Sequence, residues 1–512
     1  MTGTIEIIGG GPAGLYVARL LKLREPSLQV TVHERMGGDS ETFGFGVGLT
    51  ESTMRNLAAA DPATAEHVRA ASYAGHDLRL KGHDATVTLH GARNLAIGRA
   101  TLLEILSAAA TEAGVEIRRG CDIDAAQLDA DVVIAADGVR SGTREKYAAE
   151  LGVRSSLGRT RFVWCGADYA VDSAFFSAVQ RGEELFVLHA YPYAGDRSTF
   201  LIEVDDRTWH SAELEDFDAQ APTGETDHAS VALLEDVFAP ELRGRKLLTN
   251  RTRWSRFTNL TLERWSIDNV VLLGDAAHTA HYTLGSGTKL ALEDAIILAD
   301  ALTGESSTAA AFTAYEAARR PPVERFTKLA HRSQAWWESY RLRAHLPAER
   351  LALSYMTRSG NLTLTDYAAE QLDSARRALA WLGDGVPDNA AELDAWVLSR
   401  PLAEAELALP ARLLTRNRLP TGTALHEVTW DDPDVWSAPA DALIATLTGS
   451  VGLPVLLTGP RTPEAVAARI DLAERLRFEG ERPVGVFLDG EDGPAAAATT
   501  VAAGRADFVV TP

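Results

Sequence analysis

The pattern of apolar and polar positions in the first third of the chain predicts strands and helices in alternation. The segment 4–34 reads as a buried strand, a glycine-rich turn, a helix and a second strand, "LQVTVHE". Helical spacing returns over 52–72 and over 99–114, and "DADVVIAADG" at 129–138 predicts another buried strand that ends in Asp-Gly. Strands that alternate with helices in this order favour a parallel sheet covered by helices.

The pattern of residues changes between about 158 and 257, where antiparallel strands are predicted. Four segments there, "RFVWCGADYAV", "ELFVLHAYPY", "RSTFLIEVD" and "RTRWSRFTNL", are rich in aromatic residues. They predict a second sheet that is inserted into the first domain. The chain then returns to the first domain with "NVVLLGDAAH" and continues as helices, which the pair Pro321-Pro322 is expected to kink or interrupt.

The composition changes again after about residue 370. Alanine, leucine and proline become frequent and aromatic residues become rare, so a linker or boundary is predicted within 371–395. The fold class expected is α/β, with a small C-terminal α/β domain. The predicted segments are 1–157, 158–257, 258–370 and 371–512.

Composition and charge exclude several classes of partner. The 512 residues are 46% hydrophobic and 24% charged, with a formal net charge of −21. So acidic a chain is a poor match for nucleic acid or an anionic membrane, and no apolar run approaches the roughly 20 residues of a membrane helix. Cys121 and Cys165 have no metal-like spacing, so no metal site is expected. A strand begins within four residues of the N-terminus, which leaves no room for a signal peptide and predicts a cytoplasmic protein.

The turn at 9–14, "GGGPAG", fits the dinucleotide fingerprint G-x-G-x-x-G between a strand and a helix. Gly9 is expected to make the tight turn, Gly11 to let the backbone approach a pyrophosphate, and Gly14 to let the helix pack on the strand. Glu34, at the end of the second strand, stands where an acid binds a ribose. The alternative is that the glycines serve only a turn, and the fingerprint alone does not separate NAD from FAD.

Two later motifs complete a more specific pattern. Asp137-Gly138 and Gly274-Asp275 each follow a predicted strand, and a helix follows the second motif. Over about 3–365 the chain resembles the class A FAD-dependent aromatic monooxygenases of the para-hydroxybenzoate hydroxylase type, which carry these motifs in the same order. The resemblance implies a Rossmann-like FAD-binding domain, an inserted antiparallel β-sheet domain for the substrate, and a helical connection.

The resemblance also implies which residues hold FAD. Arg99 would reach toward the flavin, with a surface arginine at a helix start as the alternative, and Asp275 would hydrogen-bond the ribityl chain. Gly285 and Gly287 would open a helix whose N-terminus favours negative charge on the flavin. The cofactor-binding residues implied in this way are Gly9, Gly11, Pro12, Ala13, Gly14, Glu34, Arg35, Arg99, Asp137, Gly274, Asp275, Gly285, Gly287 and Thr288.

One stretch departs from the broad family and resembles a subgroup. "HYTL" at 281–284 stands where the family has a proline near the flavin, and Lys289 stands near the usual asparagine. In "GDAAHTAHYTLGSGTKLALEDA" and in "HAYPYAGDRSTFLIE" the chain is similar to salicylyl-CoA 5-hydroxylases and 2-aminobenzoyl-CoA monooxygenases, with tryptophan- and indole-oxidising relatives.

Three side chains are candidates for catalysis. His281 and Tyr282 are expected to border the space where flavin and substrate meet, and His189 lies on an aromatic strand of the inserted sheet. For both histidines a place in the core is an equal alternative, whereas His278 is expected to be buried and hydrogen-bonded behind the turn. A histidine in the substrate site could act as a general base on a ring substituent.

These features predict an FAD-dependent monooxygenase that hydroxylates a small aromatic molecule, which could be an aryl-CoA, an aminobenzoate or salicylate, or an indole or tryptophan. By resemblance, NAD(P)H would reduce FAD, and O2 would form a C4a-hydroperoxyflavin that transfers oxygen to the ring. The alternatives are flavin-dependent epoxidation or oxidation of an indole-containing intermediate, and an FAD-binding scaffold without activity. The sequence does not set the oligomeric state.

The C-terminal residues carry a weaker resemblance. In CoA-dependent members of the subgroup a TIM-barrel flavin reductase of the old-yellow-enzyme type follows the hydroxylase, and 400–423 and 502–512 are similar to the two ends of such a barrel. Only about 140 residues follow position 370, whereas a full barrel needs roughly 200 to 250. A shortened, partial TIM-barrel-like remnant without a cofactor is therefore expected, with an unrelated small α/β domain as the alternative.

Overall fold

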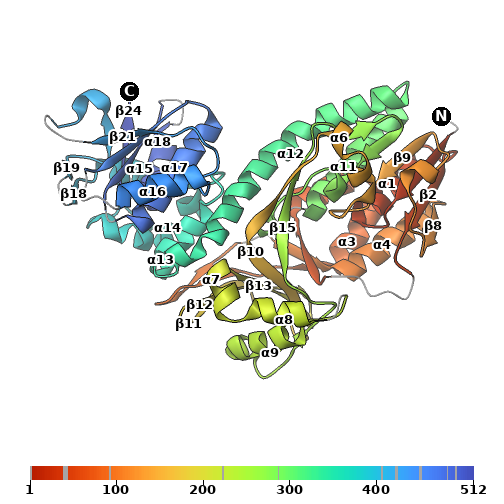
Figure 1. Cartoon of the computed structure of the whole chain (residues 1–512), viewed down its shortest axis with the longest axis horizontal. Coiled ribbons are helices and arrows are strands. Elements are labelled where there is room, and N and C mark those ends of the chain that lie inside the picture. The colour runs from red at the N-terminus through yellow and green to blue at the C-terminus, as the bar shows by residue number, and fades with distance from the viewer. Residues whose placement is uncertain are drawn as a thin grey trace. The chain divides into compact units, whose positions relative to one another are not determined.

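The computed structural model of the chain divides into two compact units (Figure 1). The first unit comprises 1–81 and 91–341, and the second comprises 82–90 and 342–512. The segment 342–370, which the sequence-based division joins to the first domain, lies in the second unit. The structure describes residues 3–37, 44–91, 94–221, 224–285, 287–404, 407–420, 425–448, 453–480, 482–489 and 493–512.

A six-stranded sheet forms the centre of the first unit. All its neighbouring strands are parallel except β16 and β17. The strand β9 is wholly apolar and buried, as expected inside a parallel sheet that is covered on both faces. In spatial order the strands are β16 (Ser266–Ile267), β17 (Val270–Leu272), β9 (Val132–Ala135), β1 (Thr4–Ile8), β2 (Gln29–Glu34) and β8 (Glu116–Arg119).

Long helices pack around this sheet and confirm the mixed α/β class. The helix α1 (Pro12–Arg24) contacts α4 (Arg99–Glu112) and α11 (Gly287–Gly304). In turn, α11 packs on the longest helix, α12 (Thr308–Glu338). Figure 1 shows α1 and α11 close together beside the strands.

The proline pair does not interrupt α12, which was one of the two effects expected from the sequence. Pro321 and Pro322 both lie inside one continuous helix. Prolines remove backbone N–H donors and usually break a helix. Here Tyr315 before the pair and Val323 after it are buried in the same apolar core, and this packing holds the helix together on both sides.

An antiparallel sheet follows in the first unit. Its strands pair antiparallel except β11 and β5, which run parallel, and β15 (Ser255–Thr261) pairs with β10 beside this path. The short helices α7 (Asp206–Ser211), α8 (Leu214–Gln220) and α9 (His228–Val237) contribute side chains to its apolar core. The spatial order is β14 (Leu247–Leu248), β10 (Arg154–Ala167), β13 (Arg197–Val204), β12 (Glu184–Ala194), β11 (Ala174–Arg181) and β5 (Leu78–Lys81).

A three-stranded sheet contacts β12 of the antiparallel sheet. It consists of β3 (Gly46–Thr50), β7 (Asn94–Gly98) and β4 (Tyr73–Ala74), and β12 contacts all three. The helix α2 (Glu51–Ala60) follows β3 directly, and the Thr50 hydroxyl caps it by accepting the Thr53 N–H.

The second unit contains a five-stranded parallel sheet. The first strand of this sheet, β20, pairs with its last, β24, and the other strands follow β24 in reverse sequence order. The helices α16 (Ala438–Thr448), α17 (Pro463–Glu479) and α18 (Gly493–Ala502) alternate with these strands. In spatial order the strands are β20 (Leu413–Thr415), β24 (Phe508–Thr511), β23 (Val484–Phe487), β22 (Val455–Thr458) and β21 (His426–Thr429).

Helices and one distant segment complete the second unit. The helices α13 (Ala348–Met356), α14 (Leu364–Leu379) and α15 (Ala390–Ser399) precede the sheet. The segment 82–90, which carries β6 (Thr86–Leu89), joins this unit through hydrogen bonds. The Asp84 carboxylate accepts the Ala348 N–H at 2.9 Å, and the Gln371 side chain donates to the His90 carbonyl at 2.7 Å. In the part of the chain that the structure describes, no helix is long and apolar enough to cross a bilayer.

Candidate active site

The glycine-rich turn after β1 has one face packed and one face open. Gly9 has a φ of +107°, and a Cβ on it would lie 2.3 Å from the Ala136 carbonyl oxygen. A Cβ on Gly14 would lie 2.0 Å from the Gly9 carbonyl oxygen, so the protein itself requires both glycines. A Cβ on Gly11 would meet no atom of the described residues within 4 Å. Gly11 therefore leaves open space at the N-terminus of α1, which favours an anion such as a pyrophosphate.

Glu34 lies against the same turn. Its Oε2 accepts the Gly10 N–H at 2.7 Å, and its Oε1 accepts the Met36 N–H at 2.8 Å. The carboxylate is thereby fixed beside the turn with lone pairs left over for ribose hydroxyls. Arg35 follows it on the exposed surface, and Pro12 begins α1.

The Asp-Gly motif after β9 brings a polar atom that lacks a partner. Asp137 accepts the Thr143 N–H on Oδ2 at 3.2 Å, whereas its buried Oδ1 has no hydrogen-bond partner in the described structure. Buried carboxylate oxygens are normally hydrogen-bonded, so this one is suited to a ligand. Nearby, Arg144 donates to the Val139 carbonyl at 2.7 Å and ties the loop after the motif together.

The Gly-Asp motif after β17 lies between α1 and α11. Gly274 has a φ of +62°, and a Cβ on it would lie 3.3 Å from the Ala13 Cβ and 3.2 Å from the Ala291 Cβ. Asp275 has accessible surface, yet burial within the protein raises the pKa of its carboxyl group. Its Oδ1 lies 3.7 Å from the position of a Cβ on Gly287, at the start of α11.

Arg99, at the start of α4, is partly buried and lies near enough to Asp275 for each charge to affect the other. Burial lowers the pKa of its guanidinium group, and the opposite charge of Asp275 counteracts that effect. Neither side chain has a hydrogen bond or ion pair within the described ranges, although each feels the charge of the other. Gly285, with a φ of +63° and open space at its Cα, and the partly buried Thr288 complete the cofactor residues predicted from the sequence.

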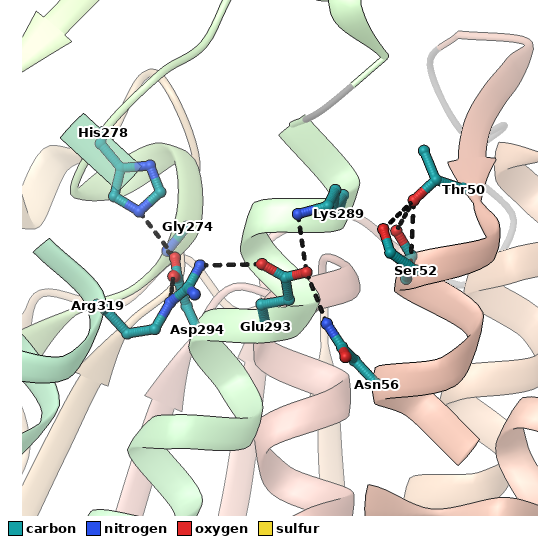
Figure 2. Close-up of polar contacts among 10 residues, drawn as sticks. Thr50, Ser52, Asn56, Gly274, His278, Lys289, Glu293, Asp294 and Arg319 are labelled. Carbon is teal, nitrogen blue, oxygen red and sulfur yellow. Dashed lines mark hydrogen bonds and ion pairs between the residues drawn. The ribbon is translucent and has the colours of Figure 1, made fainter. Parts of the chain in front are cut away.

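A buried ion network supports the Gly-Asp turn from behind (Figure 2). The His278 Nε2 lies 2.8 Å from Asp294 Oδ2, and the Arg319 Nε lies 2.7 Å from Asp294 Oδ1. The Gly274 N–H donates to the same carboxylate at 3.3 Å. Burial alone would raise the pKa of Asp294, but the charges and hydrogen bonds of His278 and Arg319 bring it below its ordinary value. His278 is thus buried and hydrogen-bonded, as expected from the sequence.

The network extends along α11 toward α2. The Glu293 carboxylate lies 2.8 Å from the Lys289 Nζ and accepts from the Asn56 side chain at 2.9 Å. Figure 2 shows these groups near Thr50 and Ser52, whose hydroxyls lie 2.8 Å apart at the start of α2. Lys289, which stands near an asparagine of the broad family, is therefore held by its own helix.

A second buried cluster gathers around Glu203 on β13. Only 2% of Glu203 is exposed; the Tyr282 hydroxyl donates to its Oε1, and the His189 Nε2 lies 3.6 Å from that oxygen. Burial alone would raise the pKa of this carboxyl group, but His189, His281 and the Tyr282 hydrogen bond bring it below its ordinary value. Sequence analysis missed Glu203. The available signal was a lone acid in the apolar run 200–204, between Ile202 and Val204.

The three candidate catalytic residues therefore meet around one carboxylate. His281 is 1% exposed, and its Nδ1 lies 3.0 Å from the Thr283 hydroxyl. Tyr282 keeps partial exposure, although burial raises the pKa of its hydroxyl well above the ordinary value. His189 is buried on β12.

Aromatic rings enclose this cluster. Ring centroids lie 4.9 Å apart between Phe162 and Tyr282 and 4.7 Å apart between Phe257 and His281. The His189 ring lies 4.2 Å from that of Trp337. These ring contacts give the cluster largely apolar surroundings.

Two other polar side chains of the first unit have structural partners. Tyr191 donates to the Gly46 carbonyl at 2.7 Å, and burial raises the pKa of its hydroxyl to about 12. The Arg253 guanidinium group lies 2.9 Å from the Asp218 carboxylate. No group of metal-ligating side chains is present among the residues with defined positions.

Comparison with known proteins places these features in one family. The family described as "FAD binding domain" matches residues 1–330. The salicyloyl-CoA 5-hydroxylase of a Streptomyces species is 34% identical over 531 residues, which cover 99% of this chain and 99% of that protein. The 3-hydroxy-4-methyl-anthranilyl-(aryl-carrier protein) 5-monooxygenase of Streptosporangium sibiricum is 38% identical and covers 72% of this chain and 97% of its own.

Solved structures agree in fold. The crystal structure of 2-methyl-3-hydroxypyridine-5-carboxylic acid oxygenase is 20% identical, with a TM-score of 0.54. The match covers 73% of this chain and 97% of that one. The first 330 residues and the whole-chain relative thus point to the same kind of protein.

Proposed function

Because the chain belongs to the FAD-binding-domain family of aromatic hydroxylases and monooxygenases, we propose that its substrate is an aromatic acid activated as a thioester. FAD would lie over the turn at 9–14 and reach the start of α11, and the substrate ring would lie beside Tyr282. The two relatives, an aryl-CoA hydroxylase and an aryl-carrier-protein monooxygenase, support the thioester over a free indole.

The relation of Arg99 to Asp275 carries the cofactor part of this proposal. A cation and an anion within the protein face each other without a direct ion pair or hydrogen bond in the described structure. Arg99 is partly buried and Asp275 is exposed, so a bound ligand that covered both would have to supply polar partners in place of water. Two further features of the same unit support a bound ligand. Gly11 has open space at its Cα, and the buried Oδ1 of Asp137 has no hydrogen-bond partner in the described structure.

The residues present fit FAD. Gly11 and the N-terminus of α1 would bind the pyrophosphate, and Glu34 the ribose. Asp275 would accept hydrogen bonds from the ribityl chain, and the N-terminus of α11 would favour negative charge on the flavin. When bound, FAD reduced by NAD(P)H and reoxidised by O2 supplies the oxygen that is transferred to the ring.

The second cluster would act on the substrate. The aromatic side chains hold the ring flat and exclude water from it. A histidine, His189 or His281, would hold the proton of a ring substituent as a general base, and the Tyr282 oxygen would orient that substituent. The C-terminal residues would form the shortened barrel and hold no second flavin. This agrees with the pairing of the first strand, β20, to the last, β24, and with a relative that matches the chain over its whole length.

An Asp275→Ala variant tests this assignment. It should fold but lose FAD on gel filtration, since a hydrogen bond that involves a charged group contributes about 1.5–3 kcal/mol. The wild-type protein should hold about one FAD per chain and no FMN. NADH or NADPH oxidation should rise when salicyloyl-CoA is added, and a product 16 Da heavier, the mass of one added oxygen, should be found by mass spectrometry. Full FAD content in the variant would contradict the role of Asp275, and a wild-type protein without flavin would contradict the proposed function.

A further inference from the structure

The Glu203 carboxylate has no part in the FAD contacts proposed above. It is buried on β13 and accepts the hydroxyl of Tyr282, a side chain that keeps some exposed surface. A buried carboxylate next to a substrate position costs free energy unless it serves a purpose or is fully paired. The His189 Nε2 lies 3.6 Å from its Oε1, and this buried nitrogen has no hydrogen-bond partner in the described structure.

Resting on the proposed function, we propose that Glu203 is a specificity-determining residue. It admits an aromatic ring whose carboxyl group is masked as a thioester or amide, and it rejects the free carboxylic acid. The ring of such a substrate is uncharged where it contacts Tyr282.

The charges around Glu203 support this selection. Two unit charges within a few ångströms interact strongly where water is excluded, so a second carboxylate beside Glu203 is repelled. The groups that face Glu203 are His189 from β12, His281 and Tyr282 from the loop before α11, and Glu338 from α12. Glu338 is a further acid, and burial raises the pKa of its carboxyl group. Over the described residues, no lysine or arginine contacts Glu203, His189 or Tyr282 to receive a substrate carboxylate.

The hydrogen bonding of Tyr282 points the same way. Its single hydroxyl hydrogen is donated to Glu203 Oε1, so its oxygen can only accept from a ligand. A carboxylate needs donors and finds none at this oxygen. A phenol, an aromatic amine or an amide N–H has the hydrogen that this oxygen can accept. A thioester carbonyl has no such hydrogen, but unlike a carboxylate it carries no charge for Glu203 to repel.

Calorimetric titration of the FAD-loaded full chain with salicylamide and with salicylate tests the inference. The two probes have the same ring and nearly the same size, but at pH 7 only salicylate is anionic. The wild-type protein should bind salicylamide at least about tenfold more tightly than salicylate. Glu203→Gln should bring the two affinities within about threefold, mainly because salicylate binds better. Glu203→Asp, which keeps the charge, should retain the preference.

Tyr282→Phe is the matched control, because it removes the hydroxyl group and keeps the carboxylate. It should weaken binding of both probes and leave the preference for salicylamide above about tenfold. Glu203→Gln is expected to bind salicylate more tightly than the wild type does, and a damaged fold would not produce such a gain in affinity. The wild-type comparison needs no variant, so it remains decisive if the glutamine variant does not fold.

Two outcomes would overturn the inference alone: equal affinities in the wild-type protein, or an unchanged preference in Glu203→Gln. If the FAD-loaded protein bound neither probe, the space beside Tyr282 would not be an aryl site. The proposed function would then fail together with the inference.

Discussion

Alanine at Gly11 and, separately, at Gly14 should separate a glycine required by a ligand from a glycine required by the fold. Both positions belong to the same short turn and receive the same added methyl group. In the Gly11 variant that group would point into open space, and in the Gly14 variant it would point at a backbone carbonyl. We expect Gly11→Ala to lose FAD affinity while the apoprotein keeps its stability, and Gly14→Ala to lose stability.

The size of each effect follows from the geometry. The Cβ of an alanine at position 14 would lie 2.0 Å from the Gly9 carbonyl oxygen, far inside ordinary contact, and a backbone atom cannot rotate away. Overpacking of this kind costs about 1–3 kcal/mol, or a factor of about 5 to 150 in the folding equilibrium. Gly11 has a φ of −76° and a ψ of 180°, which any residue adopts. Its substitution costs a few tenths of a kcal/mol as a helix cap and gains a similar amount from the unfolded chain.

Urea denaturation of the three apoproteins measures the stability term, and flavin absorbance after gel filtration measures the cofactor term. A Gly9→Ala variant serves as a second fold control, because it combines a 2.3 Å contact with a φ of +107°. The reasoning is refuted if Gly11→Ala retains FAD as the wild type does, or if Gly14→Ala apoprotein is as stable as the wild type.

Two further predictions concern groups away from the cofactor. Asp294→Ala should lower the free energy of unfolding by about 3–5 kcal/mol, because it leaves His278 and Arg319 buried without their carboxylate, and an unchanged urea midpoint would contradict this. The pKa of Asp294 is depressed in the folded protein, so its contribution to the free energy of unfolding should be complete above the ordinary carboxyl pKa near 4 and should fade as the pH falls below it. The stabilities of the wild type and the variant should therefore converge at acid pH. Burial raises the pKa of the Cys165 thiol to about 12. A thiol reagent at pH 8 should therefore label Cys121 alone in the native protein and both cysteines in urea. Rapid labelling of Cys165 in the native protein would contradict its burial.

Local patterns in the sequence were sufficient for the glycine-rich turn and for the two motifs at strand ends. Their residues are neighbours in the chain, and the reason for each, such as the close approach of Gly14 to Gly9, acts over a few positions. The mixed α/β class followed in the same way from the alternation of strands and helices. Each of these features depends on the geometry of a single strand and the turn after it.

The substrate side could be predicted only in part. Tyr282 and His189 were singled out, but the acid that joins them is 79 residues from Tyr282, and no periodicity links β13 to that loop. The same holds for Asp294, whose arginine partner is 25 residues away on another helix. The continuity of α12 through its two prolines was also beyond the sequence, because packing on α11 and the core overrides the local preference.

The segment 82–90 has a consequence for how the protein is made. It belongs to the second unit, whereas the rest of that unit begins at Leu342, about 250 residues later in the chain. At a synthesis rate of 5–20 residues per second, the segment leaves the ribosome roughly 10 to 50 s before its hydrogen-bond partner Ala348 exists. The second unit therefore cannot be completed until long after 82–90 has been translated. A gene fragment that starts at residue 342 would lack this piece, so any attempt to produce the second unit alone should add 82–90 by fusion or as a separate peptide.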